Sequence, residues 1–459
     1  MTSQTALVES STTPSRADGG ADHFRPIQYL GSKVRLLDVI ESAIDEVDPT
    51  KGSVLDLFSG SGVVGARLNR SRAVTAVDVQ EYSRVLASAL MTPARLMPAT
   101  VERIAAAAAA DFQARSGGGA RGLLELEQHA MRAVGEGDPL PLCEILEKGS
   151  PAACRLGEGP DPGLLADAIA AASQEFGEET SALTLVDHYG GVYFSYVQAL
   201  QLDCLLTQVR ALPQGALRDT ALAASIGAAS EVVTSVGNHF AQPLRPRDRN
   251  NMPKASALGA AVRSRSRDVL AIFADRVASY AAASTAAHQA TAIRGDYRSF
   301  LATHEGEVAV TYADPPYTRE HYSRFYHVLE TMVLGDVPDI STVTVAGKTA
   351  LSRGLYRKDR HQSPFCIRTQ APDAFRDLFS GARRFDAPLV VSYSPYTTGT
   401  AARPESRLLR IPEVVELAGE HFGEVTVRTG GSVSHSKFNA GRLNGDIERE
   451  AEQLIVCIP

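Results

Sequence analysis

The sequence predicts an α/β protein with a doubly wound, mostly parallel sheet and a large helical insertion. A short apolar strand, VLDL at residues 54–57, leads into the glycine-rich turn FSGSGVVG and then into the helix-like ARLNR. A second strand, AVTAVDV at 73–79, is followed by a helical stretch that begins at Tyr82. This alternation of strand, helix and strand is how a doubly wound sheet begins. Strand signals resume only at 308–317, 389–395 and 454–458, so we expect the second half of the chain to complete the sheet.

The stretch between these two groups of strands is rich in Ala and Leu and has few strand signals. Helical periodicity is clear at 164–176 and 192–212, whereas Gly135 to Gly163, with five prolines and many glycines, is typical of a long irregular loop. The predicted organisation is therefore one α/β domain that a mainly helical segment interrupts. Its parts are a disordered tail at 1–22, the α/β domain at 23–95 and 290–459, and the helical insertion at 96–289.

Length and composition narrow the class of protein. At 459 residues the chain exceeds one ordinary domain, and with 44% hydrophobic and 22% charged residues it can bury a sizeable core. The formal net charge of −7 argues against a uniformly basic nucleic-acid coat. It leaves room for a local basic face, because net charge averages over the whole surface.

The cysteines and the apolar runs indicate the cellular compartment of the protein. Five scattered cysteines form no CxxC pair, which argues against a disulfide framework or a zinc knuckle and favours a reducing environment. No apolar run approaches the ~20 residues that span a bilayer, and the first residues lack the basic and apolar regions of a signal peptide. We expect a cytoplasmic protein without a membrane segment.

The turn after the first strand has the features of a nucleoside site. Glycines at a strand-to-helix turn let the backbone bend tightly and approach a ligand closely. Asp78 ends the next strand, eighteen residues after Gly60, and at that spacing a carboxylate can accept hydrogen bonds from ribose hydroxyls. The run from Gly60 to Gly65 also satisfies the dinucleotide pattern GxGxxG. At this point a dinucleotide and S-adenosylmethionine are both open.

A second motif, DPPY at 314–317, comes just after the apolar strand that begins at Val308. Two consecutive prolines fix φ and remove two N–H donors, so the chain must leave the sheet in a rigid extended turn. That turn holds the Asp314 carboxylate and the Pro315 carbonyl as a pair of acceptors for an amine with two N–H donors. Tyr317 offers a ring face for a planar base. A Pro-Pro strand exit is common by itself, but the whole motif together with the glycine turn favours methylation of an amine.

The chain resembles the S-adenosylmethionine-dependent amino-methyltransferases, and among them the adenine-N6 DNA methyltransferases related to DNA adenine methylase. FSGSG at 58–62 is similar to their FxGxG cofactor loop, and DPPY to their catalytic motif. YLGSK at 29–33 is similar to a third segment, Y-x-G-[GS]-K, which in the family helps to close the pocket around the methionine moiety of the cofactor. The resemblance covers 24–100 and 290–400 and implies a Rossmann-like methyltransferase sheet.

Weaker matches add to this picture. Gly295-Asp296-Tyr297 resembles the family's acidic residue near the cofactor adenine, and the stretch from Tyr193 to Asp203 resembles a helix of this subfamily, to which we assign only structural roles. The run His321 to His327 has the composition of a loop facing DNA, or of the start of a helix. The resemblance thus implies the catalytic residues Asp314, Pro315, Pro316 and Tyr317. It also implies the cofactor-binding residues Tyr29, Gly31, Ser32, Lys33, Asp56, Phe58, Gly60, Gly62, Asp78 and Asp296.

Basic residues gather at 242–268, in a chain that is acidic overall. Such a local excess is typical of phosphate contacts, although a charge run is often only a solvated face. A second candidate is 356–362, and a third, weaker one is His435 to Asn439. The predicted DNA-binding residues are Arg245, Arg247, Arg249, Lys254, Arg263, Arg265, Arg357 and Lys358.

The resemblance implies a site-specific transfer of the S-adenosylmethionine methyl group to N6 of a flipped-out adenine in double-stranded DNA. No metal-ligand spacing appears, and the reaction needs no metal. A cognate restriction or defence nuclease is a possible partner. Three other functions stay open: methylation of RNA or of another planar amine, a nicotinamide oxidoreductase that uses the GxGxxG pattern, and an inactive DNA-binding module. The intact DPPY argues against the last two.

Overall fold

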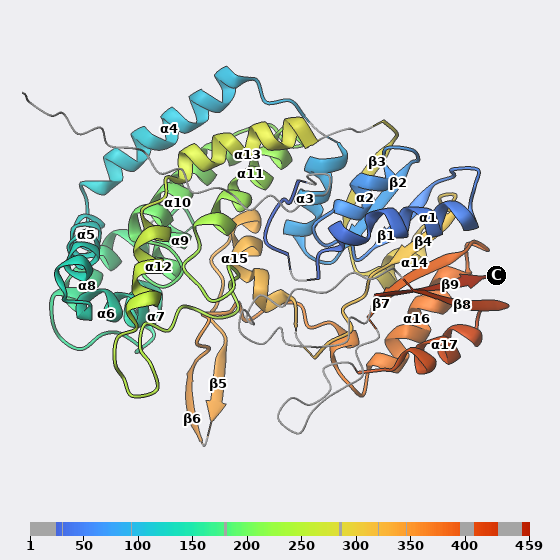
Figure 1. Cartoon of the computed structure of the whole chain (residues 1–459). Coiled ribbons are helices and arrows are strands. Elements are labelled where there is room, and N and C mark those ends of the chain that lie inside the picture. The colour runs from blue at the N-terminus through green and yellow to red at the C-terminus, as the bar shows by residue number, and fades with distance from the viewer. Residues whose placement is uncertain are drawn as a thin grey trace, which may run out of the picture.

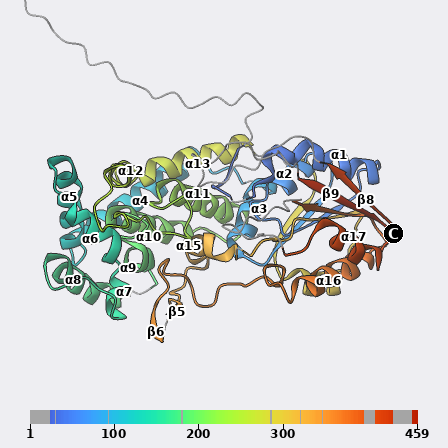
Figure 2. The same ribbon diagram turned by 60° about the horizontal axis from the view of Figure 1, so that its bottom comes forward.

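The computed structural model describes residues 24–29, 31–92, 94–178, 181–283, 287–319, 321–345, 347–394, 408–429 and 452–459. The expected tail at 1–22 lies outside the described residues. The molecule is elongated: the sheet and its helices form one end, and a group of helices forms the other (Figures 1 and 2).

The central sheet has seven strands in the order β3-β2-β1-β4-β7-β9-β8. Its neighbours pair in parallel from β3 to β7, whereas β9 runs antiparallel to both β7 and β8. The strands are β1 (Val54–Leu57), β2 (Val74–Asp78), β3 (Ala290–Arg294), β4 (Val310–Ala313), β7 (Leu389–Tyr393), β8 (Glu424–Thr429) and β9 (Gln453–Ile458). The two halves of the chain meet where β1 pairs with β4, so the second half completes the sheet as expected.

Helices cover both faces of the sheet, which makes it doubly wound. Successive strand residues point to opposite faces. Val54 of β1 therefore joins the core of one face, and Leu55 and Leu57 join the core of the other. The first face carries α1 (Leu37–Val47), α2 (Val63–Leu68) and α3 (Glu81–Met91), preceded by the 3₁₀ turn η1 (Lys33–Leu36). The second face carries α14 (Tyr297–Thr303), α16 (Ala371–Arg383), α17 (Ile411–Gly419) and the turn η2 (Pro364–Cys366).

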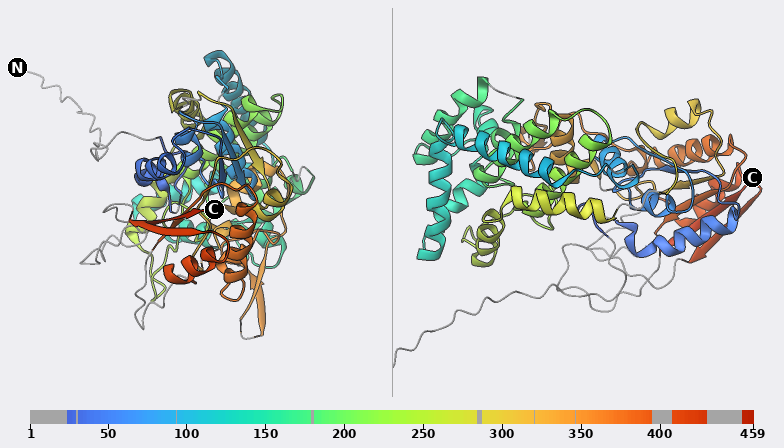
Figure 3. Two further views of the ribbon diagram at one scale, coloured as in Figure 1. Left: turned by 90° about the vertical axis from the view of Figure 1, so that its right-hand side faces the viewer. Right: turned by 90° about the horizontal axis from the view of Figure 1, so that it is seen from above.

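The chain between α3 and β3 is helical throughout its described elements. These are α4 (Pro98–Ser116), α5 (Arg121–Glu136), α6 (Leu140–Lys148), α7 (Pro151–Arg155), α8 (Leu164–Glu178), α9 (Thr184–Tyr189), α10 (Tyr196–Arg210), α11 (Ala216–Val232), α12 (Ala255–Arg265) and α13 (Val269–Ala283). Helix α11 packs against α3 and α13, so the core of the helical part continues into the first face of the sheet (Figure 3). The domain boundaries at 96 and 289 stay a prediction.

The prediction of an irregular loop at 135–163 is wrong over much of that range, because α6 and α7 lie within it. Pro139, Pro141 and Pro151 lie at the starts of these helices, where the missing N–H has no intrahelical partner to lose, and Pro160 and Pro162 lie outside them. Ser150 caps α7 by accepting a hydrogen bond from the Ala153 N–H at 3.1 Å. Proline here starts helices and does not break them.

An antiparallel hairpin, unanticipated from the sequence, extends from the body after the catalytic motif. Helix α15 (Ser323–Leu334) follows DPPY, and then β5 (Thr342–Val345) pairs with β6 (Lys348–Leu351). Figure 1 shows this hairpin projecting away from the rest of the molecule.

All five cysteines are free. Among the described residues, no helix has the length and apolar character that a membrane crossing requires.

Candidate active site

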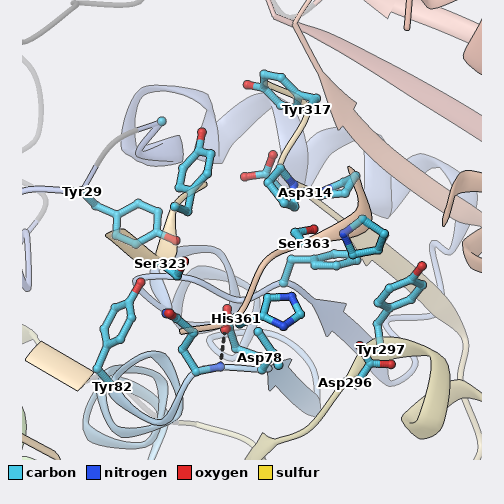
Figure 4. Close-up of a pocket in the computed structure, with 18 of the residues that line it drawn as sticks. Tyr29, Asp78, Tyr82, Asp296, Tyr297, Asp314, Tyr317, Ser323, His361 and Ser363 are labelled. Atoms are coloured by element: carbon cyan, nitrogen blue, oxygen red, sulfur yellow. Dashed lines mark hydrogen bonds between the residues drawn. The ribbon is translucent and has the colours of Figure 1, made fainter. Parts of the chain in front are cut away.

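A pocket of about 860 Å³, counted with its open mouth, lies at the carboxyl ends of β1, β2 and β4. Crevices at this edge of open α/β sheets are where ligands bind. Figure 4 shows Tyr29 and Tyr82 on one side of the pocket, Asp296 and Tyr297 on the other, and Asp314 with Tyr317 between them. The catalytic and cofactor residues from the sequence that line it are Tyr29, Gly31, Lys33, Phe58, Asp78, Asp296, Asp314, Pro315, Pro316 and Tyr317. Ser32, Asp56, Gly60 and Gly62 lie behind its wall.

The glycine turn is tight because its backbone takes left-handed conformations in quick succession. Phe58, Gly60 and Gly62 have φ of 66°, 53° and 77°. A Cβ on Gly60 would lie 2.6 Å from the Tyr29 hydroxyl oxygen, and one on Gly62 would lie 2.7 Å from the Cα of Ala87. A side chain at either glycine would push the turn away from the pocket. Phe58 also has a positive φ, although its side chain is bulky. Such strained positions cluster at ligand sites.

Asp78 fastens this turn to the end of β2. Its carboxylate accepts hydrogen bonds from the backbone N–H groups of Gly60 and Gln80, each at 2.9 Å. Figure 4 draws one of these bonds at Asp78. Burial raises the pKa of Asp78, and these hydrogen bonds oppose that rise. Because Asp78 also lines the pocket, it connects the shape of the glycine turn to whatever the pocket binds.

Aromatic rings form opposing walls. On one side Tyr29 stacks on Tyr326 with ring centroids 5.0 Å apart and an interplanar angle of 6°. On the other, Phe58 packs 5.1 Å from Tyr297. Asp296 caps α14 by accepting the Arg298 N–H at 3.0 Å, and so it is held beside this second wall. Such walls suit a planar heterocycle with polar edges.

The catalytic motif follows β4 directly, and its carboxylate is ion-paired. Lys33 Nζ lies 2.8 Å from Asp314 Oδ2 and 2.9 Å from an oxygen of Glu452. Burial alone would lower the pKa of Lys33, but Asp314 and then Glu452 raise it, and the balance lies well above the usual lysine value. Lys33 is therefore a permanent cation beside Asp314.

Tyr317 sits between the pocket and the core of the second face. Its ring is only 5% exposed and packs against Tyr393 at a centroid distance of 5.0 Å. Lys33 Nζ lies 5.8 Å from the Tyr317 ring centroid, in cation–π range. The ring therefore reaches the pocket along part of its surface.

Asp56 belongs to the support of the site. It lies on β1, is 1% exposed and does not line the pocket. Burial raises its pKa well above the usual value, and the charges of Asp314 and Asp78 raise it further, so its neutral form is favoured. Ser32 directly precedes η1 and makes no side-chain capping hydrogen bond to it.

Several lining residues escaped the sequence reasoning. Gln80 and Tyr82 follow Asp78, and their place at the start of α3 is a signal that could have found them. Tyr322 and Ser323 begin α15, within the run that we expected to face DNA or start a helix. His361 lies within the second basic candidate at 356–362, whereas no sequence pattern marks Ser363 and Pro364, which come next along the chain.

The prediction that Arg265 and Arg357 bind DNA is wrong, because their guanidinium groups are buried. Arg265 pairs with Glu127 and donates to the Gly191 carbonyl oxygen at 2.7 Å. Arg357 pairs with Asp336 at 2.6 Å. Both arginines join separate segments of the fold and offer no charge to a phosphate.

The other basic candidates are accessible to different degrees. Arg245, Arg249, Arg263 and Lys358 are exposed, and Lys254 is half-buried. Arg247 is half-buried and pairs with Glu147 at 3.1 Å. Their contact with DNA stays a prediction. The third candidate, His435 to Asn439, lies outside the described residues.

A glycine-turn pocket that opens beside Asp-Pro-Pro-Tyr, at the carboxyl ends of parallel strands, defines an amino-group methyltransferase. Residues 29–117 and 264–387 match the family model of the D12 class N6 adenine-specific DNA methyltransferases. The chain belongs to this family, and the resemblance stated from its motifs is confirmed. The matched segments contain YLGSK, the glycine turn, Asp78, Asp296 and DPPY. The nicotinamide oxidoreductase alternative is thereby set aside. No curated protein matches the chain.

Proposed function

We propose that the chain uses S-adenosylmethionine to methylate N6 of a flipped-out adenine at specific sites in double-stranded DNA. The family gives adenine-specific DNA methylation. The observation that carries the finer proposal is that Asp314, Asp78 and Phe58 of the glycine turn line one and the same pocket. A methyl donor on the turn would therefore lie next to the acceptors for the amine.

The pocket fits such a cofactor on several grounds. Its aromatic walls suit the adenine ring, and Asp78 and Asp296 are carboxylates that can accept hydrogen bonds from ribose hydroxyls and from the adenine amine. The missing side chain at Gly60 lets the Tyr29 hydroxyl pack against the turn, where a Cβ would lie only 2.6 Å from it. When bound, the cofactor supplies an electrophilic methyl group on a sulfonium. Tyr29, Gly31 and Lys33 line the pocket, and we assign them to the methionine moiety because they match the segment that closes the pocket around it in the family.

The residues of the catalytic motif bind and orient the target base. The Asp314 carboxylate and the Pro315 carbonyl would accept the two N6 hydrogens and raise the electron density on nitrogen. Tyr317 would contact the flipped ring with the part of its surface that reaches the pocket. Extraction of the base from the duplex costs on the order of a few kcal/mol, which contacts in the pocket must offset.

Double-stranded DNA would bind across the pocket mouth and the helical part. The exposed residues Arg245, Arg249 and Arg263 lie on the loop before α12 and on α12 itself. Exposed arginines on one such segment can contact successive phosphates. We propose that the helical part carries target recognition, since phosphate contacts position the duplex but do not read its sequence.

An assay with a tritiated methyl donor tests the proposal on three substrates in parallel: duplex DNA, structured RNA and peptide. We expect label in duplex DNA, and label in RNA alone would contradict the choice of substrate. Long-read sequencing of host DNA with and without the protein would then report the modified base and its site together. Methylation at one sequence would protect that sequence from a cognate restriction or defence nuclease, if the host has one.

A further inference from the structure

Lys33 holds together three segments that are far apart in the sequence. Its ammonium lies 2.8 Å from Asp314 Oδ2, 2.9 Å from Glu452 Oε1 and 3.3 Å from the Gly31 carbonyl oxygen. Gly31 precedes η1, Asp314 follows β4, and Glu452 directly precedes β9. An ammonium has three N–H donors, so these three acceptors match its full capacity.

Glu452 is part of the core and does not touch the pocket. Its side chain is 1% exposed, and Oε1 also accepts a hydrogen bond from the Ser392 hydroxyl of β7 at 2.5 Å. Lys33 is 5% exposed, whereas Asp314 is 22% exposed and lines the pocket. Glu452 therefore lies behind Lys33 and does not contact the substrate itself.

The charges explain why a second carboxylate would be useful here. Lys33 and Asp314 alone would cancel, and the amine would meet a neutral pair. With Glu452 the three groups carry a net charge of −1. During transfer the amine nitrogen bonds to the methyl carbon as the carbon–sulfur bond breaks. Positive charge passes from sulfur to nitrogen until one nitrogen proton leaves to water. A fixed negative charge beside that nitrogen stabilises the transition state.

We propose that Glu452 is a positioning residue for methyl transfer. It offsets the charge of Lys33, so that Lys33 can fix the Asp314 carboxylate while that carboxylate keeps its negative charge for the target amine. This inference rests on the proposed function, because it assumes that Asp314 receives the amine. It adds a residue that directly precedes β9 and that no motif of the chain includes.

The first test replaces the charge of Glu452 and keeps its shape. Glu452→Gln retains an acceptor for Lys33 and Ser392, and we expect kcat to fall by about 10- to 100-fold with little change in KM for cofactor or DNA. The matched control is Glu127→Gln, which alters a carboxylate that is also 1% exposed and ion-paired but lies in the helical part. Thermal denaturation of both variants shows whether they are folded. An unchanged kcat in Glu452→Gln would overturn the inference.

A double-variant cycle shows whether Glu452 acts through Lys33. In a Lys33→Met background, the further change Glu452→Gln should cost much less in kcat than it does in the wild type, because the cation that it offsets is gone. Equal losses in the two backgrounds would mean an independent structural role and would overturn the proposal.

A measurement that needs no activity separates this inference from the proposed function. The Lys33 ammonium faces Asp314, Glu452, Tyr317 and Tyr312, and ¹⁵N NMR of labelled lysines follows its titration. Glu452→Gln should move that titration to lower pH, and Glu127→Gln should leave it unchanged. No movement in Glu452→Gln overturns the inference even in an active enzyme. If the wild type transfers no methyl group, the proposed function fails, and the titration still decides the coupling.

Discussion

Asp314 lies in the pocket with its charge already paired, and that pairing decides how substitutions at the site should behave. Lys33 holds one carboxylate oxygen at 2.8 Å. A carboxylate accepts at both oxygens, so this ion pair fixes the side chain and still allows a hydrogen bond from an amine. The cofactor wall formed by Asp78 and the glycine turn lies apart from this contact. Catalysis and cofactor binding should therefore respond to different residues.

Asp314→Ala tests that separation. We expect methylation to be abolished, because the acceptor for the amine is lost, and S-adenosylmethionine binding to be largely retained. A tritiated-methyl assay and calorimetric titration measure the two properties. Asp339→Ala is the control, since its carboxylate is 84% exposed and does not line the pocket. Wild-type turnover by Asp314→Ala would refute the assignment of the catalytic residue.

Gly60→Ala tests the glycine turn, which we assign to cofactor binding. The added Cβ would meet the Tyr29 hydroxyl at 2.6 Å, at a φ of 53° that side chains disfavour. We expect cofactor affinity to fall by at least about tenfold, the equivalent of 1.4 kcal/mol. Gly135→Ala is the control, because its Cβ would enter open space within α5. That change should leave affinity intact and stabilise the helix by about 0.5–1 kcal/mol. Equal affinities for Gly60→Ala and the wild type would contradict the role given to the turn.

At the scale of elements, helix α12 shows that neighbouring arginines of one basic run can have opposite roles. Arg263 and Arg265 are two residues apart, which on a helix places them on different faces. Arg263 is exposed, and Arg265 is buried in its ion pair with Glu127. The count of basic residues in a segment therefore overstates the charge that DNA can meet.

The pair of variants Arg265→Met and Arg263→Met separates these roles. Loss of Arg265 leaves Glu127 buried without its partner, and we expect the free energy of unfolding to fall by about 3–5 kcal/mol. Arg263→Met should leave stability unchanged, weaken DNA binding and reduce the salt dependence by about one phosphate contact. Chemical denaturation and fluorescence anisotropy at several salt concentrations measure both. Normal stability of Arg265→Met, or normal DNA affinity of Arg263→Met, would contradict the respective assignment.

At the scale of the whole molecule, the helical part and the sheet share one apolar core. Helix α11 packs on α3 of the sheet, and the buried residues of both belong to a continuous cluster. We expect one cooperative thermal transition by calorimetry, because neither part can keep its core when the other unfolds. Ile226→Ala, a fully buried change in α11, should lower the temperature of that single transition. Two separate transitions, with only one shifted by the variant, would contradict the shared core.

The sequence allowed much of the sheet and of the pocket to be predicted, and the failures have physical causes. β1 at 54–57 has the expected bounds, because a central parallel strand is a continuous apolar run. β3 is an edge strand without a fully buried residue, and so its sequence lacks that signal. Arg265 and Arg357 were misassigned because burial depends on which carboxylate faces them. Glu452 was missed because its partner Lys33 is more than 400 residues away in the chain.

The most direct test of the central claim is mass spectrometry of nucleosides from duplex DNA that has been incubated with the protein and S-adenosylmethionine carrying a trideuterated methyl group. We expect trideuterated N6-methyl-2′-deoxyadenosine from DNA treated with the wild type and none from DNA treated with Asp314→Ala. Absence of labelled adenine with the wild type, or label on another base, would contradict the claim that this pocket methylates adenine N6.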